Sequence, residues 1–308
     1  MRKPRRLESA SRAPIAASLL AGMNRKRILA DPRLSASGTA HGTSEALQAT
    51  VAGIREFNGL HPVHAAYVYA QNFVSELAET FISWAEMKAF VKIIAAAEDI
   101  YMPSGPPMSP ITTSYFTCWS FFDACAGPAN ETIGSILLEF CGHFCIGNEL
   151  SRLIRMMQES RMGFYINRGR KGDLLILEEL LTGVVRTAIV PAGDFGQLGQ
   201  LWYVRVLPPP FSGSSTHVVF TTPYIVLAPE LPEWLAYFDR ALPSHSAVND
   251  YEWHMKFGPR RDYWNDFVFE GYVNYKAGAI YLAGVPDIPA SRPHSAVNQS
   301  SDSGGRAQ

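Results

Sequence analysis

The residues with the clearest chemical potential are four cysteines in neighbouring segments of the chain. Cys141, His143 and Cys145 are the densest cluster, and residues four apart share one helix face, so both thiols could reach one metal ion. Zinc takes four ligands, usually from Cys-x2-Cys pairs that this chain lacks. Cys118 and Cys125 could complete the set only if their segment packs alongside. We therefore predict no metal site and interpret all four cysteines as reduced, buried helical thiols.

Nucleophilic catalysis requires a nucleophile with a base beside it. The chain has no Gly-x-Ser-x-Gly motif, and although His217 is close to Ser214 and Ser215, nothing fixes a third partner. Three evenly spaced glycines in residues 193–199 have no helix after them, so they predict a turn rather than a phosphate-binding loop. We predict no cofactor, and a hydrolase-type enzyme stays open only if its unknown catalytic residues assemble in three dimensions.

Basic and aromatic residues in the second half of the chain are typical of a nucleic-acid-binding surface. Arg168, Arg170, Lys171 and Arg205, with Trp202 for stacking, are the binding-surface candidates. Four acidic residues of the same segment cancel most of this charge: Asp173, Glu178, Glu179 and Asp194. Nucleic-acid binding is therefore an alternative rather than the leading interpretation.

The elements that must position these residues begin with helices. Apolar residues recur every three or four positions over 63–81, 84–94, 130–144 and 148–157, a period that predicts amphipathic helices. Four prolines in residues 103–110 predict a loop that interrupts them. We expect a helical domain over residues 44–160.

The period changes at Gly163. Short segments at 163–166, 174–178, 184–190, 201–207 and 217–227 are rich in β-branched and aromatic residues. Five short strands joined by brief turns bury one face most readily by curling into a barrel. We predict a small antiparallel barrel-like domain over 161–228.

The C-terminal segment, residues 229–290, returns to a helical pattern. Helices are expected over 230–240 and 259–275, with a last strand at 280–282. The many aromatic residues of 251–275 indicate burial between other elements or a surface for a protein partner. We expect these helices to pack back on the rest of the chain.

Both ends of the chain are polar and without a sustained period. Residues 1–43 predict a disordered basic extension, and residues 291–308 a disordered tail. Basic residues before the apolar stretch 13–23 resemble a signal peptide, but further basic residues follow where a cleavage site should lie. No apolar run is long enough to span a bilayer, so we predict no membrane association and a cytoplasmic location.

The composition of the chain limits which classes of protein it can belong to. The chain has 308 residues, 47% hydrophobic and 18% charged, with a formal net charge of −1. This apolar content suffices for a core, and the near-neutral charge gives no overall attraction to nucleic acid or anionic membrane.

Four segments together resemble a group of bacterial proteins with a helical N-terminal half and a barrel-like middle. They are Glu-Ser-Arg-Met-Gly at 159–163, the run at 199–209, the run at 217–224 and the run at 281–289. The resemblance covers about residues 44–290 and implies one folded unit, with no assigned activity and no catalytic residue. The middle part is also similar to the β segment of bacterial proteins with a Cys-rich zinc tail, but no cysteine follows Cys145.

The sequence thus predicts an α+β fold with a helical N-terminal region, a five-stranded barrel and C-terminal helices. The leading functional interpretation is a non-catalytic binding or interaction protein of the bacterial cytoplasm. Its partner is unknown, and a protein is one candidate. The alternatives are a nucleic-acid-binding barrel and a hydrolase-type enzyme.

Overall fold

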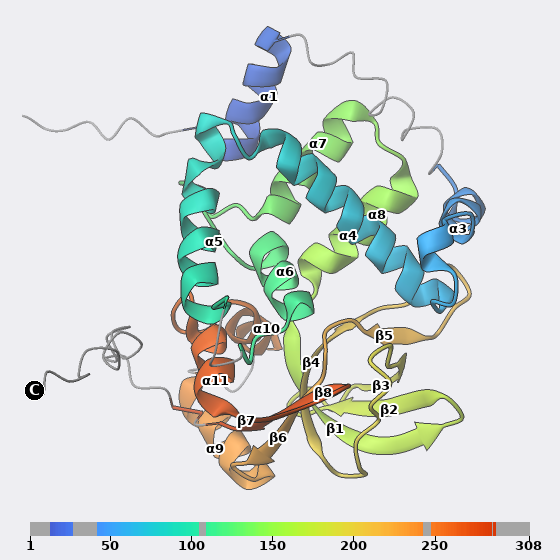
Figure 1. The fold of residues 1–308 in the computed structure, drawn as a ribbon, viewed down its shortest axis with the longest axis vertical. Coiled ribbons are helices and arrows are strands. Elements are labelled where there is room, and N and C mark those ends of the chain that lie inside the picture. The colour runs from blue at the N-terminus through green and yellow to red at the C-terminus, as the bar shows by residue number, and fades with distance from the viewer. Residues whose placement is uncertain (1–12, 27–41, 105–108, 243–247, 285, 288–308) are drawn as a thin grey trace, which may run out of the picture.

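The computed structural model describes residues 13–26, 42–104, 109–242, 248–284 and 286–287. It confirms an α+β fold with a helical N-terminal part and a small barrel. In Figure 1 the helices of the first half lie above the barrel, and the C-terminal helices lie beside it, below α5. None of the helices in these ranges is both long enough and apolar enough to cross a bilayer.

The helical part contains six helices after residue 42. They are α3 (Ser44–Ala52), α4 (Pro62–Phe81), α5 (Lys88–Tyr101), α6 (Thr113–Phe122), α7 (Ile133–Phe144) and α8 (Asn148–Glu159). Two short 3-10 turns lie among them, η2 (Arg55–Phe57) and η3 (Ala85–Met87). The side-chain oxygens of Thr43, Thr112 and Thr132 cap α3, α6 and α7 by accepting from backbone amides of the first turn.

A further helix, α1 (Ile15–Lys26), lies where the sequence predicts a disordered extension. Leu19 and Met23 are fully buried one helical turn apart, and Ile15 is also buried. The amides of Ile15 and Ala16 donate to the carboxylate of Glu131 at 2.5 and 3.0 Å, which satisfies two of the free donors at the helix start. The rest of the predicted extension, apart from residues 13, 14, 42 and 43, lies outside the described residues, as does the predicted tail.

The barrel is formed by strands β1 (Met162–Lys171), β2 (Leu174–Glu179), β3 (Val185–Ile189), β4 (Leu201–Leu207) and β5 (His217–Val219). Their order is β1-β2-β3-β5-β4, and pairing of β1 with β4 closes the ring. The prediction that all pairs are antiparallel is wrong, because β3 and β5 pair in parallel. The predicted strand 217–227 is interrupted, and its second half is β6 (Tyr224–Ala228), which pairs with β4 outside the ring.

The C-terminal segment contains helices α9 (Leu231–Ala241), α10 (Val248–Phe257) and α11 (Tyr263–Gly271). The predicted helix 259–275 ends at Gly271, and its last residues form strand β7 (Tyr272–Lys276), which pairs with β8 (Ala279–Ala283). Because β8 also pairs in parallel with β6, this segment extends the sheet as well as covering it with helices.

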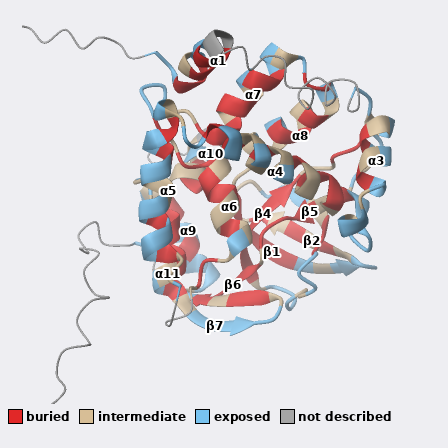
Figure 2. Cartoon of the chain, turned by 45° about the horizontal axis from the view of Figure 1, so that its top comes forward, coloured by how far each residue is buried: buried red, intermediate tan, exposed pale blue. Residues whose placement is uncertain are grey.

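The buried side chains form three clusters, and two of them join parts that are distant in the sequence. The helical cluster includes Leu207 and Phe220 of the barrel region, and the aromatic cluster unites α6, the outer face of β4 and all three C-terminal helices. The third cluster fills the barrel interior. Figure 2 shows buried residues running through all layers, with exposed residues on the outer sides of α3, α5 and β7.

Candidate functional site

The predicted binding-surface residues separate into two groups. Arg168, Arg170 and Lys171 are exposed on β1, beside its turn into β2. Arg168 pairs with Glu178 at 2.8 Å, and the guanidinium of Arg170 lies 3.8 Å from the Phe195 ring centre. The ion pair neutralises the charge of Arg168, and the ring contact covers the guanidinium of Arg170. The β1–β2 hairpin therefore presents less free positive charge than its sequence suggests. Nucleic-acid binding there stays a prediction, and salt-sensitive retention on single-stranded DNA would test it.

The other two candidates are not on the surface, and this part of the prediction is wrong. Trp202 is fully buried inside the barrel. Arg205 is 1% exposed and points the opposite way, toward the helices that cover the outer face of β4. Every residue of β4 is buried, because one face lines the barrel and the other is covered by distant segments.

Arg205 belongs to a cluster of three charges that we call the charged junction: Asp123, Arg205 and Lys256. Arg205 donates to Oδ2 of Asp123, and Lys256 Nζ lies 3.1 Å from Oδ1 of the same carboxylate. Lys256 also donates to the backbone carbonyls of Gln158 and of Ser160, the latter at 2.8 Å. The three side chains come from the end of α6, from β4 and from α10, so the junction ties all three parts of the fold together.

The electrostatics of the charged junction are those of a closed structural cluster. Burial acts to lower the pKa of Arg205, but the Asp123 carboxylate outweighs it and holds the pKa above its usual value. Burial lowers the pKa of Lys256, and the same carboxylate partly offsets this. One carboxylate therefore serves two cations, and the carbonyls at the end of α8 contribute the remaining negative partial charge.

A second buried cluster surrounds Glu179 at the end of β2. This carboxylate is 1% exposed and accepts from Arg161 at 2.6 Å, from Thr182 at 2.7 Å and from Arg186 at 3.4 Å. Burial acts to raise the pKa of Glu179, but these donors and charges outweigh it and hold the pKa below its usual value. Glu179 is thus kept ionised, which suits an ion pair and not a general acid.

A third polar group lies between the C-terminal helices. His254 Nε2 and the Tyr237 hydroxyl are 2.9 Å apart, and Tyr237 in turn contacts the hydroxyl of Tyr263. Burial lowers the pKa of His254 to about 4, so its ring is neutral at physiological pH. The hydrolase-type alternative gains no nucleophile from these contacts and stays a prediction.

The four cysteines occupy different environments. Cys118 and Cys141 are buried and Cys125 is partly buried, but the prediction of a buried helical thiol is wrong for Cys145, which is exposed in the left-handed turn that ends α7. Burial raises the pKa of Cys118 to about 11 and also raises those of Cys125 and Cys141, which disfavours reactive thiolates. Within the described ranges, no three His, Cys, Asp or Glu side chains gather so that they could hold a metal ion.

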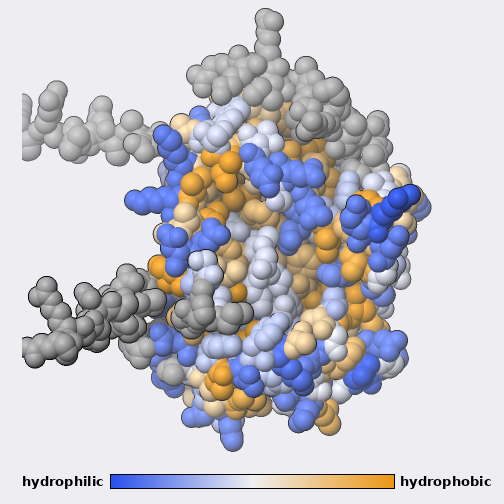
Figure 3. Space-filling view, in the orientation of Figure 1, coloured by the Kyte–Doolittle hydropathy of each residue, from blue (hydrophilic) through white to orange (hydrophobic). Residues whose placement is uncertain are grey.

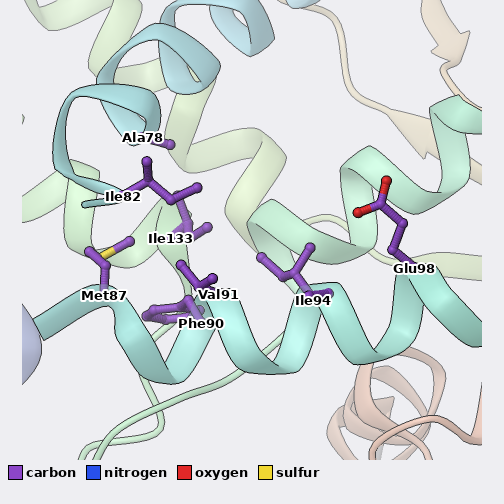
Figure 4. Close-up of a pocket in the computed structure, with 9 residues that line it drawn as sticks. Ala78, Ile82, Met87, Phe90, Val91, Ile94, Glu98 and Ile133 are labelled. Atoms are coloured by element: carbon purple, nitrogen blue, oxygen red, sulfur yellow. The ribbon is translucent and has the colours of Figure 1, made fainter. Parts of the chain in front are cut away.

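An open apolar groove lies in the helical part beside α5, and we call it the α5 groove. It has a volume of about 170 Å³. Its lining comes from the end of α4, from η3 and α5, and from the start of α7: Ala78, Ile82, Met87, Phe90, Val91, Ile94, Ala95, Glu98 and Ile133. Figure 4 shows Val91 facing Ile82 and Ile133, with Ile94 and then Glu98 farther along the same side of α5.

The α5 groove follows from helix geometry. Met87, Val91, Ile94 and Glu98 are three or four residues apart and so form one stripe along α5. The turn η3 places α5 against the end of α4 through Phe90, which is buried. Along the adjoining stripe Met87 is buried and Val91 is 39% exposed, and Ile82 at the end of α4 is 52% exposed beside it. Figure 3 shows apolar side chains gathered in a hollow between α5 and α4.

Comparison with protein-family models, with curated proteins and with solved structures finds no match for this chain. The resemblance to the bacterial group therefore stays a prediction.

Sequence reasoning did not identify the α5 groove as a site. Its residues were recognised as part of a helical apolar pattern, which is the pattern of any helix that packs on a core. The signal that distinguishes an open stripe from a covered one is the position of other helices, and a single sequence does not contain it.

Proposed function

We propose that the protein is a non-catalytic interaction protein that binds an apolar segment of a protein partner in the α5 groove. The observation that carries the proposal is a preformed apolar groove with exposed walls. Its volume of about 170 Å³ lies below the roughly 300–1,000 Å³ of small-molecule sites. A space of this size suits one or two apolar side chains of a protein, which anchor many interfaces.

The residues that line the groove suit the binding of an apolar group and not catalysis. Eight of its nine residues are apolar, and the ninth, Glu98, lies at one end. Burial of Ile82 and Val91 by a partner would remove apolar surface from water, which drives association. The titratable clusters of the molecule, in contrast, already have their partners inside the fold.

Site-specific photocrosslinking, followed by binding with purified proteins, tests the proposal. A photoreactive residue is placed at Val91 in the full chain, and another at Val185, which is 57% exposed on the barrel and serves as the control. We expect a discrete protein adduct from position 91 that position 185 does not give. The purified adduct partner should then lose affinity for the Val91→Asp variant by about 2 kcal/mol, the scale of an interface anchor.

The control variant is Val185→Asp, which introduces the same charge at another exposed apolar site. It should bind the partner as the wild type does. Equal binding of the partner by the Val91→Asp variant, or no adduct from position 91, would contradict the proposal.

A further inference from the structure

The charges on α5 run along the α5 groove in a definite order. Lys88 and Lys92 occupy the first half of the helix, and Glu98 and Asp99 occupy the last turn. All four side chains are exposed. Glu98 lines the groove itself, and the others lie on the solvent side of the same stripe. The groove therefore has a basic end near Met87 and an acidic end near Glu98.

This order is the reverse of the one that stabilises a helix. Acidic residues are favourable at a helix start and basic residues at its end, each by roughly 0.3–1 kcal/mol. Helix α5 has no acidic residue in its first turn and no basic residue in its last. Lys88 and Lys92 are also four residues apart, a spacing at which like charges repel. The pattern thus costs α5 stability.

Interactions within the chain do not explain the pattern. In the described part of the chain, none of the ion pairs involves Lys88, Lys92, Glu98 or Asp99. Locally unfavourable choices of this kind concentrate at functional surfaces, where a partner supplies the compensation.

We infer that the occupant of the α5 groove is an amphipathic helix with acidic residues near its start and basic residues near its end, lying parallel to α5. This inference rests on the proposed function. Such a helix has the charge order that stabilises most helices. Aligned parallel to α5, its acidic start meets Lys88 and Lys92, and its basic end meets Glu98 and Asp99.

The dimensions agree with a short helix. Residues 87–98 of α5 span about 16 Å at the usual rise of 1.5 Å per residue, or roughly three turns. A partner helix of about three to four turns would insert one or two apolar residues, such as those at i and i+4, into the groove and lay its other apolar residues along the rim, as in other helix-in-groove complexes.

The test uses two helix-stabilised peptide probes of about 14 residues with the same apolar face. The charged peptide has glutamates in its first turn and lysines in its last, and the neutral peptide has glutamine at those positions. Binding to the full chain is measured by fluorescence anisotropy at low and high salt. We expect the charged peptide to bind about ten-fold more tightly at low salt, and the advantage to shrink at high salt.

A variant of the protein tests the same charge pairs from the α5 side of the complex. Replacing the three charges outside the groove lining (Lys88→Gln, Lys92→Gln, Asp99→Asn) should remove most of the advantage of the charged peptide and leave the affinity of the neutral peptide unchanged. A spin label on the start of the charged peptide should broaden the amide signals near Met87 and spare those near Glu98.

The outcomes separate the inference from the proposed function. Equal affinity of both peptides, or broadening near Glu98, would overturn the inference. The proposed function would still stand if both peptides bind the wild type and lose binding in the Val91→Asp variant. If neither peptide binds, or if binding ignores Val91→Asp, then both fail.

Discussion

The charged junction and the α5 groove lie in the same molecule and use their residues in opposite ways. The junction gathers Asp123, Arg205 and Lys256 from three parts of the chain, buries them and pairs them internally. The groove leaves apolar walls open and carries charges that none of the described ion pairs satisfies. Residues with obvious chemistry therefore stabilise the fold here, and ordinary apolar residues line the groove for which we propose a partner.

The largest effect is expected when the carboxylate of the charged junction is removed. Asp123→Ala leaves two buried cations without their counter-charge, and we expect a loss of about 3–5 kcal/mol in the free energy of unfolding. Chemical denaturation measures it. Val91→Asp in the groove should change the same quantity by less than about 1 kcal/mol.

A matched variant separates charge from packing. Replacing all three groups (Asp123→Leu, Arg205→Met, Lys256→Met) removes the charges together and should recover much of the stability lost in Asp123→Ala. If Asp123→Ala costs no more than Val91→Asp does, the junction is not a structural cluster.

The second largest effect is expected at Glu179. Glu179→Gln removes the charge that Arg161 and Arg186 share and should cost about 2 kcal/mol near pH 7. Because the pKa of Glu179 is lower in the folded chain, its contribution is present above the ordinary value of 4.5 and is lost as the pH falls through the folded value. The stability difference between wild type and variant should therefore shrink below about pH 4.5. A difference that is constant with pH would contradict this assignment.

The ionisation of His254 should cost no stability near pH 7, and its effect should appear only at lower pH. Its pKa falls from 6.5 to about 4 on folding, so the unfolded chain takes up the proton first. The contribution of this residue to stability is complete above pH 6.5 and declines toward pH 4, by about 3 kcal/mol. Nuclear magnetic resonance of the ring should show a neutral imidazole at pH 5. A charged ring at that pH would show that the group is not sealed from water.

The smallest effect concerns the charges of α5. Lys88→Glu with Asp99→Lys restores the favourable order for the helix itself and should raise the free energy of unfolding by about 0.5–1 kcal/mol. Thermal and chemical denaturation measure the gain. The matched control is Glu45→Lys with Thr50→Glu on α3, which imposes the unfavourable order on another exposed helix and should lower stability by a similar amount. A loss of stability in the α5 variant would mean that its charges serve the fold.

Local periodicity decided much of the architecture from the sequence alone. Apolar residues every three or four positions predicted α4, α5, α7 and α8, and short alternating segments predicted strands that curl into a barrel. These predictions succeed because a period of 3.6 or 2 puts an apolar face on a single element, whatever lies beyond it. Helix α1 was missed because its stripe of Ile15, Leu19 and Met23 is short and lies among small and basic residues.

Only the tertiary structure decided which of those faces meet water. Trp202 and Arg205 lie three residues apart on β4 and point to opposite faces, and both are buried because one face closes a barrel and the other receives α6 and α10. Val91 and Ile94 have the same pattern as covered core residues, yet their stripe stays open. Burial depends on segments that are distant in the chain. Asp123, which pairs with Arg205, precedes it by 82 positions, and Lys256, which shares the same carboxylate, follows it in a C-terminal helix.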